Sequence, residues 1–312
     1  MKTKMFPALA LCSMIALTAI GANSTHAQQS VTVAPSQTFT LHAVYTKNEV
    51  LLYKMSMNMK TDVTNENGVS VLPNGPMATQ STANIRMNTT DVKPDGSARM
   101  VVQTTGMKMI LNGQEMMAPD PPIITMEVNK YGMAKMSGME NNNTPGMQMM
   151  MKMMNFQNLP TMAALLPKVP VKVGDTWTNV IPSPMDKTVN LTVNSKLLGV
   201  ETINGQETLK ISQSFTMPMN MMIGKDGPTQ DPASAMMTMK GSLTADSIDY
   251  ILPSNARLIK METKMSGAMN MNMQNMPNAN ANAPKNMNIN ITGDVHMNLS
   301  KTDIATPTQN GN

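Results

Sequence analysis

The stretch EVLLYKMSMNMKT (residues 49–61) alternates apolar and polar side chains with a period of two. Successive side chains of a β-strand point to opposite faces, so the odd positions from Leu51 to Met59 would share one face. Lys54 and Lys60 would lie on the other face. On a helix, with 3.6 residues per turn, the same methionines would spread around the axis. The stretch therefore predicts a strand with one buried, methionine-rich face.

The same parity recurs in three other stretches of the chain. Residues 209–221, 259–273 and 287–299 place mostly apolar residues at odd positions and mostly polar residues at even positions. One-sided strands of this kind are typical of antiparallel sheets with one face toward water. Asn-Gly pairs in LNGQ (111–114) and INGQ (203–206) predict tight hairpins between strands, because they tolerate positive φ.

Internal similarity of pattern divides the chain into two β units. Residues 86–109 parallel 191–219, and residues 124–139 parallel 249–267. Between the units lies a run of methionines without strand alternation, which favours a helix. The predicted organisation is a signal peptide at 1–27, a first β unit at 28–140, a methionine-rich helical linker at 141–168, a second β unit at 169–302 and a disordered tail at 303–312.

The amino-terminal residues have the features of a secretory signal peptide. Two lysines precede an apolar run from Phe6 to Ile20, and small residues precede a cleavage site near Ala27. The single cysteine, Cys12, would leave with this segment, so the mature chain would have no disulfide, thiolate metal site or cysteine nucleophile. No later stretch approaches the roughly 20 apolar residues of a transmembrane helix. We predict a periplasmic or secreted protein.

The charge balance argues against nucleic acid as a partner. The chain has 24 Lys+Arg against 20 Asp+Glu, and Lys2 and Lys4 would leave with the signal peptide, so the mature excess is 22 − 20 = 2. No basic cluster interleaved with aromatic residues is present.

Motifs for catalysis are also missing. The mature chain would keep only His42 and His296, which are far apart in sequence. His296 shares the polar face of its strand with Asp294, which could orient a general base, but we interpret His296 as a solvated side chain on a wet face. No two carboxylates stand out as a catalytic pair. We predict that the protein is not an enzyme.

Methionine is the compositional outlier, with 40 of 312 residues against 3% aromatic residues. Thioethers are soft ligands that suit Cu(I), which gives one interpretation. The candidate metal ligands are Met55, Met57, Met59, Met217, Met219, Met221, Met269, Met271 and Met273. However, methionines recur on nearly every predicted strand at a parity also held by Leu51, Ile211 and Ile259, as expected of a core. Methionine packs adaptably, so we favour packing or cavity lining.

The segment LPKVPVKVGDTWTN (166–179) carries a resemblance to known proteins. Its Pro-Val-x-Val-Gly-Asp-x-Trp entry strand, the Asn204-Gly205 turn and the G-x-x-x-x-D segment at Gly241 to Asp246 resemble uncharacterised exported bacterial β-proteins, a domain of unknown function. Proteins of this kind look similar in architecture to the LolA/LppX-type half-barrels. In those proteins a curved antiparallel sheet wraps an apolar cavity that carries lipid, so the resemblance implies a hydrophobic ligand here.

Together these patterns predict a mainly β protein, with a curved antiparallel sheet or half-barrel built from two pseudo-repeated units. Its concave face should be lined by Tyr53, Met55, Met57, Met59, Met87, Met109, Met126, Trp177, Phe215, Met217, Met219, Met239, Met261, Met265, Met271, Met287, Ile289 and Met297. The first hypothesis is a non-enzymatic cell-envelope protein that binds or carries a lipid-like molecule, without a cofactor. The alternatives are a periplasmic Cu(I)/Ag(I)-binding protein and a purely structural protein with a methionine-filled core.

Overall fold

The computed structural model describes residues 30–31, 37–117, 121–140, 164–183, 189–224, 227–228, 234–273 and 285–304. The predicted signal peptide, most of the predicted linker helix and most of the predicted tail lie outside these residues. The described end of the linker, residues 164–168, is not helical, and Asp303 and Ile304 of the predicted tail belong to the last strand. The described part of the chain contains no helix with the length and apolarity that crossing a bilayer requires.

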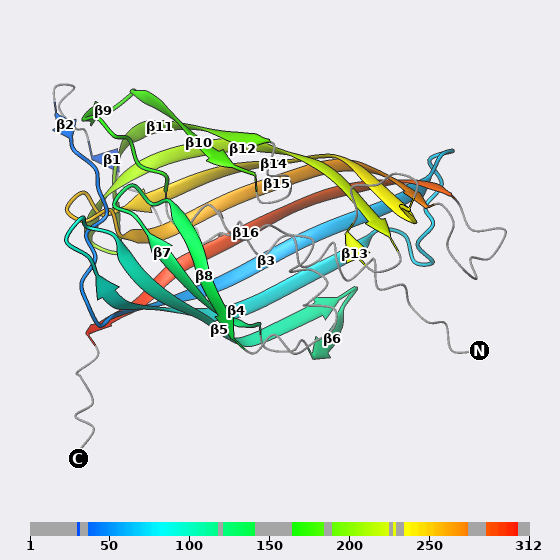
Figure 1. The fold of residues 1–312 in the computed structure, drawn as a ribbon, viewed down its shortest axis with the longest axis horizontal. Helices are drawn as coiled ribbons and strands as arrows, with labels where there is room; N and C mark the ends of the chain where they lie inside the picture. The colour runs from blue at the N-terminus through cyan, green and yellow to red at the C-terminus, as the bar shows by residue number, and fades with distance from the viewer. Residues whose placement is uncertain are drawn as a thin grey trace, which may run out of the picture.

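Within the described residues, fourteen strands form one antiparallel sheet, and a separate pair of short strands lies beside it (Figure 1). The strands are β1 (Ser30–Val31), β2 (Thr38–Phe39), β3 (Glu49–Asn65), β4 (Met77–Val92), β5 (Ala98–Leu111), β6 (Gln114–Met117), β7 (Ile123–Val128), β8 (Ala134–Glu140), β9 (Val171–Lys172), β10 (Thr176–Pro182), β11 (Asn190–Ile203), β12 (Gln206–Gly224), β13 (Gly227–Pro228), β14 (Met237–Ile251), β15 (Leu258–Met273) and β16 (Asn286–Ile304). The predicted mainly β fold is confirmed.

The sheet consists of two meanders joined at its centre. The main strand order is β11-β12-β14-β15-β16 followed by β3-β4-β5-β7-β8. The joint is the pair β16–β3, the last and the first long strands, which match from Met287 opposite Asn65 to Ile304 opposite Glu49. Each meander comes from one half of the chain, although the pseudo-repeat between the halves stays a prediction.

The alternation predicted for residues 49–61 is visible in the burial of β3. Met55, Met57 and Met59 are at most 4% exposed, whereas Lys54 and Lys60 are exposed. Burying an apolar side chain stabilises the fold by about 1.5–3 kcal/mol, so a register slip of one residue would be costly along the whole strand. The period-two pattern therefore fixes which face of the sheet becomes the core.

The predicted hairpin turns are also present. Asn112-Gly113 joins β5 to β6, Asn204-Gly205 joins β11 to β12, and both residues of each pair have positive φ. Tight two-residue hairpins need this backbone conformation, and Asn and Gly adopt it with little strain.

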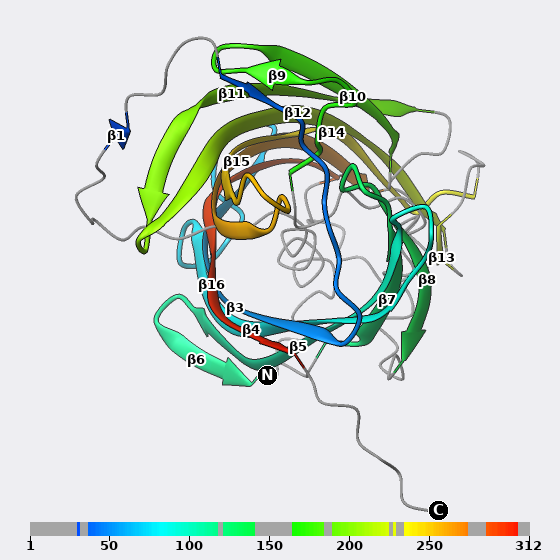
Figure 2. The same cartoon turned by 90° about the vertical axis from the view of Figure 1, so that its left-hand side faces the viewer.

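Glycines in three adjacent strands accompany the curvature of the sheet. Gly241 of β14, Gly267 of β15 and Gly293 of β16 lie on a diagonal across the sheet. Each glycine is two residues along the strand from the position directly opposite the previous one. A Cβ atom at Gly241 would come within 2.1 Å of the Ala268 carbonyl oxygen, and one at Gly293 within 2.7 Å of the Asn58 carbonyl oxygen. Glycine kinks let strands bend sharply. Viewed along its long axis, the sheet curves around an interior (Figure 2).

Candidate functional site

The concave side of the curved sheet is the methionine-rich face predicted from the sequence. Most of the predicted lining residues are buried: Tyr53, Met55, Met57, Met59, Met217, Met219, Met239, Met261, Met265, Met271, Met287, Ile289 and Met297. Met87, Met126, Trp177 and Phe215 are partly buried and pack against the same cluster. Met109 lies opposite Ser81 on β4 and is half-buried at the edge of this face. The parity argument thus brings these side chains to one face.

The pairing register brings methionines of different strands together in rows. Met261, Met297 and Met55 are directly opposite one another across β15, β16 and β3. A second row, which we call the methionine ladder, crosses four strands and consists of Met221, Met239, Met271 and Met287. Directly opposite residues of antiparallel strands have Cβ atoms about 4.5–5.5 Å apart, closer than neighbours on the same face of one strand.

Residues 37–48 cover one end of the concave face, and we call this segment the strap. Figure 2 shows it crossing the opening from β2 toward β3. Its start pairs with β9, the Ala43 amide donates to the Lys130 carbonyl at 2.8 Å, and the Val44 amide donates to the Asn255 carbonyl at 3.1 Å. The strap therefore joins β9, the β7–β8 turn and the β14–β15 turn, which are distant from one another in sequence.

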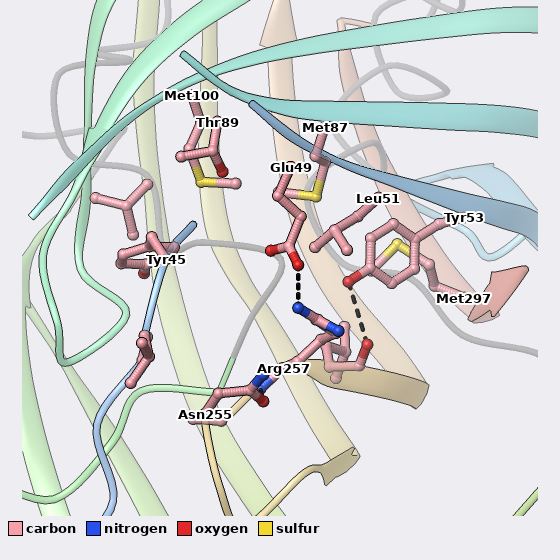
Figure 3. Close-up of a pocket in the computed structure, with 15 residues that line it drawn as sticks. Tyr45, Glu49, Leu51, Tyr53, Met87, Thr89, Met100, Asn255, Arg257 and Met297 are labelled. Atoms are coloured by element: carbon pink, nitrogen blue, oxygen red, sulfur yellow. Dashed lines mark hydrogen bonds and ion pairs between the residues drawn. The ribbon is translucent and has the colours of Figure 1, made fainter. Parts of the chain in front are cut away.

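A small cavity of about 60 Å³ lies beneath the strap (Figure 3). Its lining is mostly apolar and includes Ala43, Tyr45, Leu51, Tyr53, Met87, Met100, Leu258 and Met297. A water molecule needs at least about 10–15 Å³ of such space, so the cavity has room for a few water-sized molecules and not for an acyl chain. A larger ligand would have to displace the surrounding methionines or the strap.

We call the end of the concave face that the strap covers the mouth, and two buried or partly buried polar contacts lie there. Arg257, in the turn before β15, pairs with Glu49 at the start of β3, and the Tyr53 hydroxyl donates to the Leu258 carbonyl at 3.1 Å (Figure 3). Burial raises the pKa of the Tyr53 phenol well above its usual value, so it stays protonated and keeps donating. These contacts connect the β14–β15 turn to the central strand β3.

The chain segment Ala164 to Leu166 inserts beside the second meander. The Leu165 carbonyl accepts hydrogen bonds from Trp177 Nε1 at 2.9 Å and from Gln213 Nε2 at 3.1 Å. The Leu165 backbone amide donates to Gln213 Oε1 at 3.0 Å. The Leu166 amide donates to the Tyr131 carbonyl of the β7–β8 turn at 3.0 Å. This segment therefore bridges the two outer parts of the sheet, and it was predicted to be helical.

Asp249 is a buried carboxyl group on the largely apolar concave face. It is 2% exposed, lies opposite Ile211 and Met261, and accepts a hydrogen bond from the Ser247 hydroxyl. Burial raises its pKa to about 7. Asp249 is thus a group on the apolar face that changes charge near neutral pH.

The expectation of a solvated His296 is wrong. His296 is 6% exposed, and its Nε2 lies 2.6 Å from Asp294 Oδ2. Its strand partners on either side are Glu262 and Ser56. Burial lowers its pKa to about 4, although the charge of Asp294 acts in the opposite direction. Long neighbouring side chains cover parts of the polar face of a sheet, so parity alone does not guarantee exposure.

Within the described residues, no group of three or more His, Cys, Asp or Glu side chains is arranged to hold a metal ion. The methionines proposed as alternative metal ligands all lie on the concave face. Met217, Met219, Met221, Met269 and Met271 are buried, and Met273 packs against the same cluster. Met55, Met57 and Met59 belong to rows whose other members are mixed, whereas the methionine ladder contains thioethers alone across four strands.

Comparisons with known proteins give structural similarities but no sequence match. The sequence matches no protein-family model and no curated protein. Among solved structures, lipovitellin, from a study of its lipid–protein interactions, aligns with a TM-score of 0.43 at 7% sequence identity. The alignment covers 85% of this chain and 26% of the lipovitellin chain, so this chain spans about a quarter of that protein.

Several residues of the site were not singled out from the sequence. Glu49 and Arg257 are 208 positions apart, and nothing in either local sequence indicates their pairing. In contrast, Thr61, Thr79 and Ser81 occupy odd positions in line with Met59 and Met77, so their inward direction follows from parity. The sequence therefore indicated the direction of the polar residues on the concave face, but it did not indicate the Glu49–Arg257 contact.

Proposed function

We propose that this chain is a non-enzymatic, exported protein of the cell envelope that binds or carries an apolar, lipid-like ligand on its concave face. The observation that carries this proposal is the main core cluster, which runs across both meanders and in which methionine supplies 14 of the 42 described buried residues, more than any other residue type. Methionine has three rotatable bonds, so a methionine face can repack around ligands of variable shape.

The mouth beneath the strap is the proposed route of entry. The strap is held by the β2–β9 strand pair and by backbone hydrogen bonds from Ala43, Val44 and Asn48 to the Lys130, Asn255 and Thr89 carbonyls. The Lys47–Asp91 ion pair, the Tyr45 hydroxyl, which donates to the Asn129 carbonyl at 3.2 Å, and the buried side chains of Phe39 and Leu41 add to these contacts. Because the cavity beneath is only about 60 Å³, ligand entry in this proposal requires the strap to move and the methionines to repack. The resemblance to uncharacterised exported β-proteins, which look similar in architecture to the LolA/LppX-type half-barrels, supports the same class of ligand.

Native mass spectrometry of the purified mature protein tests the proposal. We expect co-purified or exchangeable apolar molecules, and we expect a delipidated sample to take up an acyl-chain probe from vesicles in a saturable manner. A chain that purifies empty and takes up no probe would leave the purely structural alternative, in which the methionines only fill the core.

The methionine ladder supports a second candidate function, the binding of Cu(I) or Ag(I). Its four thioethers come from four strands at the short cross-strand spacing, which brings soft ligands together without a hard donor between them. Titration with Cu(I) against a chromophoric chelator tests this function. The double variant Met239→Leu/Met271→Leu should lose affinity, while Met57→Leu, outside the ladder, should keep it. Affinity no higher than that of a scrambled methionine peptide would exclude this function.

A further inference from the structure

Within the described residues, four buried hydroxyl groups on the concave face have no hydrogen-bond partner, and three of them lie on adjacent strands. These three belong to Thr61, Thr79 and Ser81, whose exposed fractions are 1%, 1% and 2%. The fourth, Thr263, is 3% exposed and lies apart from them on β15, opposite Val295 of β16. A buried hydroxyl without a partner loses its hydrogen bonds to water and gains none in return. Native proteins rarely leave such groups unpaired, and a bound water, ion or ligand group is one explanation for an unpaired hydroxyl.

These three residues are neighbours on two adjacent strands, and we call them the hydroxyl patch. Thr79 and Ser81 are two positions apart on β4 and so share its concave face, about 6.5–7 Å apart. On β3, Met59 lies opposite Thr79 and Thr61 lies opposite Met77, which makes Thr61 the diagonal neighbour of Thr79. Side chains in diagonal positions are close enough to contact one small group between them.

The surroundings of the hydroxyl patch on this face are apolar. Its partners in the pairing register are Met57, Met59, Met77, Met109, Leu111 and Ile291. The nearest lysine of β3, Lys60, has the opposite parity and is exposed. A charged ligand group would therefore be buried here without a counter-ion, which is strongly unfavourable. A neutral polar group would instead satisfy the hydroxyls at little cost.

We infer that the hydroxyl patch binds the neutral carbonyl or hydroxyl of an amphiphilic ligand whose hydrocarbon chain lies along the methionines. The inference rests on the proposed function and narrows its ligand class to neutral amphiphiles, such as acyl esters. A carbonyl oxygen has two lone pairs and accepts from two donors, and the hydroxyls of Thr79 and of one neighbour can supply them. Anionic fatty acids and phosphate-bearing lipids with their charge at this position are disfavoured.

Replacement of Thr79 by valine tests the inference, because the two side chains have nearly the same shape and differ in the hydroxyl. The probes are methyl palmitate, which has an ester carbonyl, and heptadecane, which lacks one. Each radiolabelled probe is partitioned between neutral phospholipid vesicles and the delipidated full-length mature protein. The control is Thr82→Val, the same change on the exposed face of the same strand.

We expect Thr79→Val to weaken methyl palmitate binding about fivefold, and Thr61→Val/Thr79→Val by up to about 25-fold, since a neutral hydrogen bond contributes roughly that factor. Heptadecane binding should stay unchanged in both variants, and Thr82→Val should bind both probes like the wild type. If Thr79→Val binds both probes like the wild type, the hydroxyls contact water only, and the inference is wrong while the proposed function stands. If the wild type binds neither probe, the proposed function fails and the inference fails with it.

Discussion

Replacement of Asp249 by asparagine should stabilise the protein at high pH and leave its stability nearly unchanged at low pH. Asp249 is buried on the concave face between Ile211 and Met261, and burial raises its pKa from 3.8 to about 7. The folded state therefore holds a proton that the unfolded chain releases between about pH 4 and pH 7. Asp249 is neutral in both states below about pH 4, so it does not reduce the free energy of unfolding there. As the pH rises toward 7 the unfolded chain ionises more readily than the folded protein, and the wild type loses stability.

The size of the effect follows from the two pKa values. The difference between 3.8 and about 7 corresponds to about 4 kcal/mol over the full range, at 1.36 kcal/mol for each unit of pKa. Between pH 5 and pH 8 roughly 3 kcal/mol of this applies. Asparagine has nearly the same shape and does not titrate, so Asp249→Asn should become more stable relative to the wild type by about 3 kcal/mol across that interval. His296 titrates in both proteins, so its contribution cancels from the comparison.

Urea unfolding followed by Trp177 fluorescence at pH 5 and pH 8 measures this difference. The matched control is Asp246→Asn, a carboxyl of the same strand on the exposed face. This control should differ from the wild type by the same small amount at both pH values. A free-energy difference between Asp249→Asn and the wild type that is equal at pH 5 and pH 8 would refute the assignment of Asp249 as a buried, protonated acid.

Two further predictions concern curvature and closure. Gly241→Ala should destabilise the fold by about 2 kcal/mol or more, because its Cβ would overlap the backbone of β15, whereas Gly199→Ala, which has free space around it, should be neutral or slightly stabilising in thermal unfolding. Glu49→Gln should cost about 3 kcal/mol by leaving the Arg257 charge buried and unpaired, and Glu49→Gln/Arg257→Met should recover most of the loss. Chemical unfolding measures the free energy of unfolding of Glu49→Gln and of Glu49→Gln/Arg257→Met. An equal loss of this free energy in the two variants would contradict the pairing.

Local pattern was enough to predict the strands, their buried face and several turns. The alternation in residues 49–61 depends only on the geometry of a strand, and the positive φ of Asn112 and Asn204 depends only on neighbouring residues. For this reason the inward direction of Met55, Met57 and their equivalents on other strands follows from sequence parity.

Features that depend on distant contacts could not be predicted. The central pair β16–β3 joins strands at opposite ends of the chain. All the methionine-rich strands show the same period-two alternation, so the alternation does not indicate which strand pairs with which. The contact of Val44 with Asn255, which closes the mouth, leaves no periodic signal. The burial of His296 also depends on side chains of neighbouring strands, so its position on the polar face gave the wrong expectation.

Photo-cross-linking with a diazirine-labelled acyl ester tests the central claim, that the methionine-lined concave face binds an apolar ligand. Mass spectrometry of the digested protein maps the adducts to residues. We expect saturable adducts at concave positions such as Met55, Met57 and Met297, competed by unlabelled ester. Adducts confined to exposed positions such as Lys54 and Asn58, or a complete lack of saturable labelling, would contradict the account.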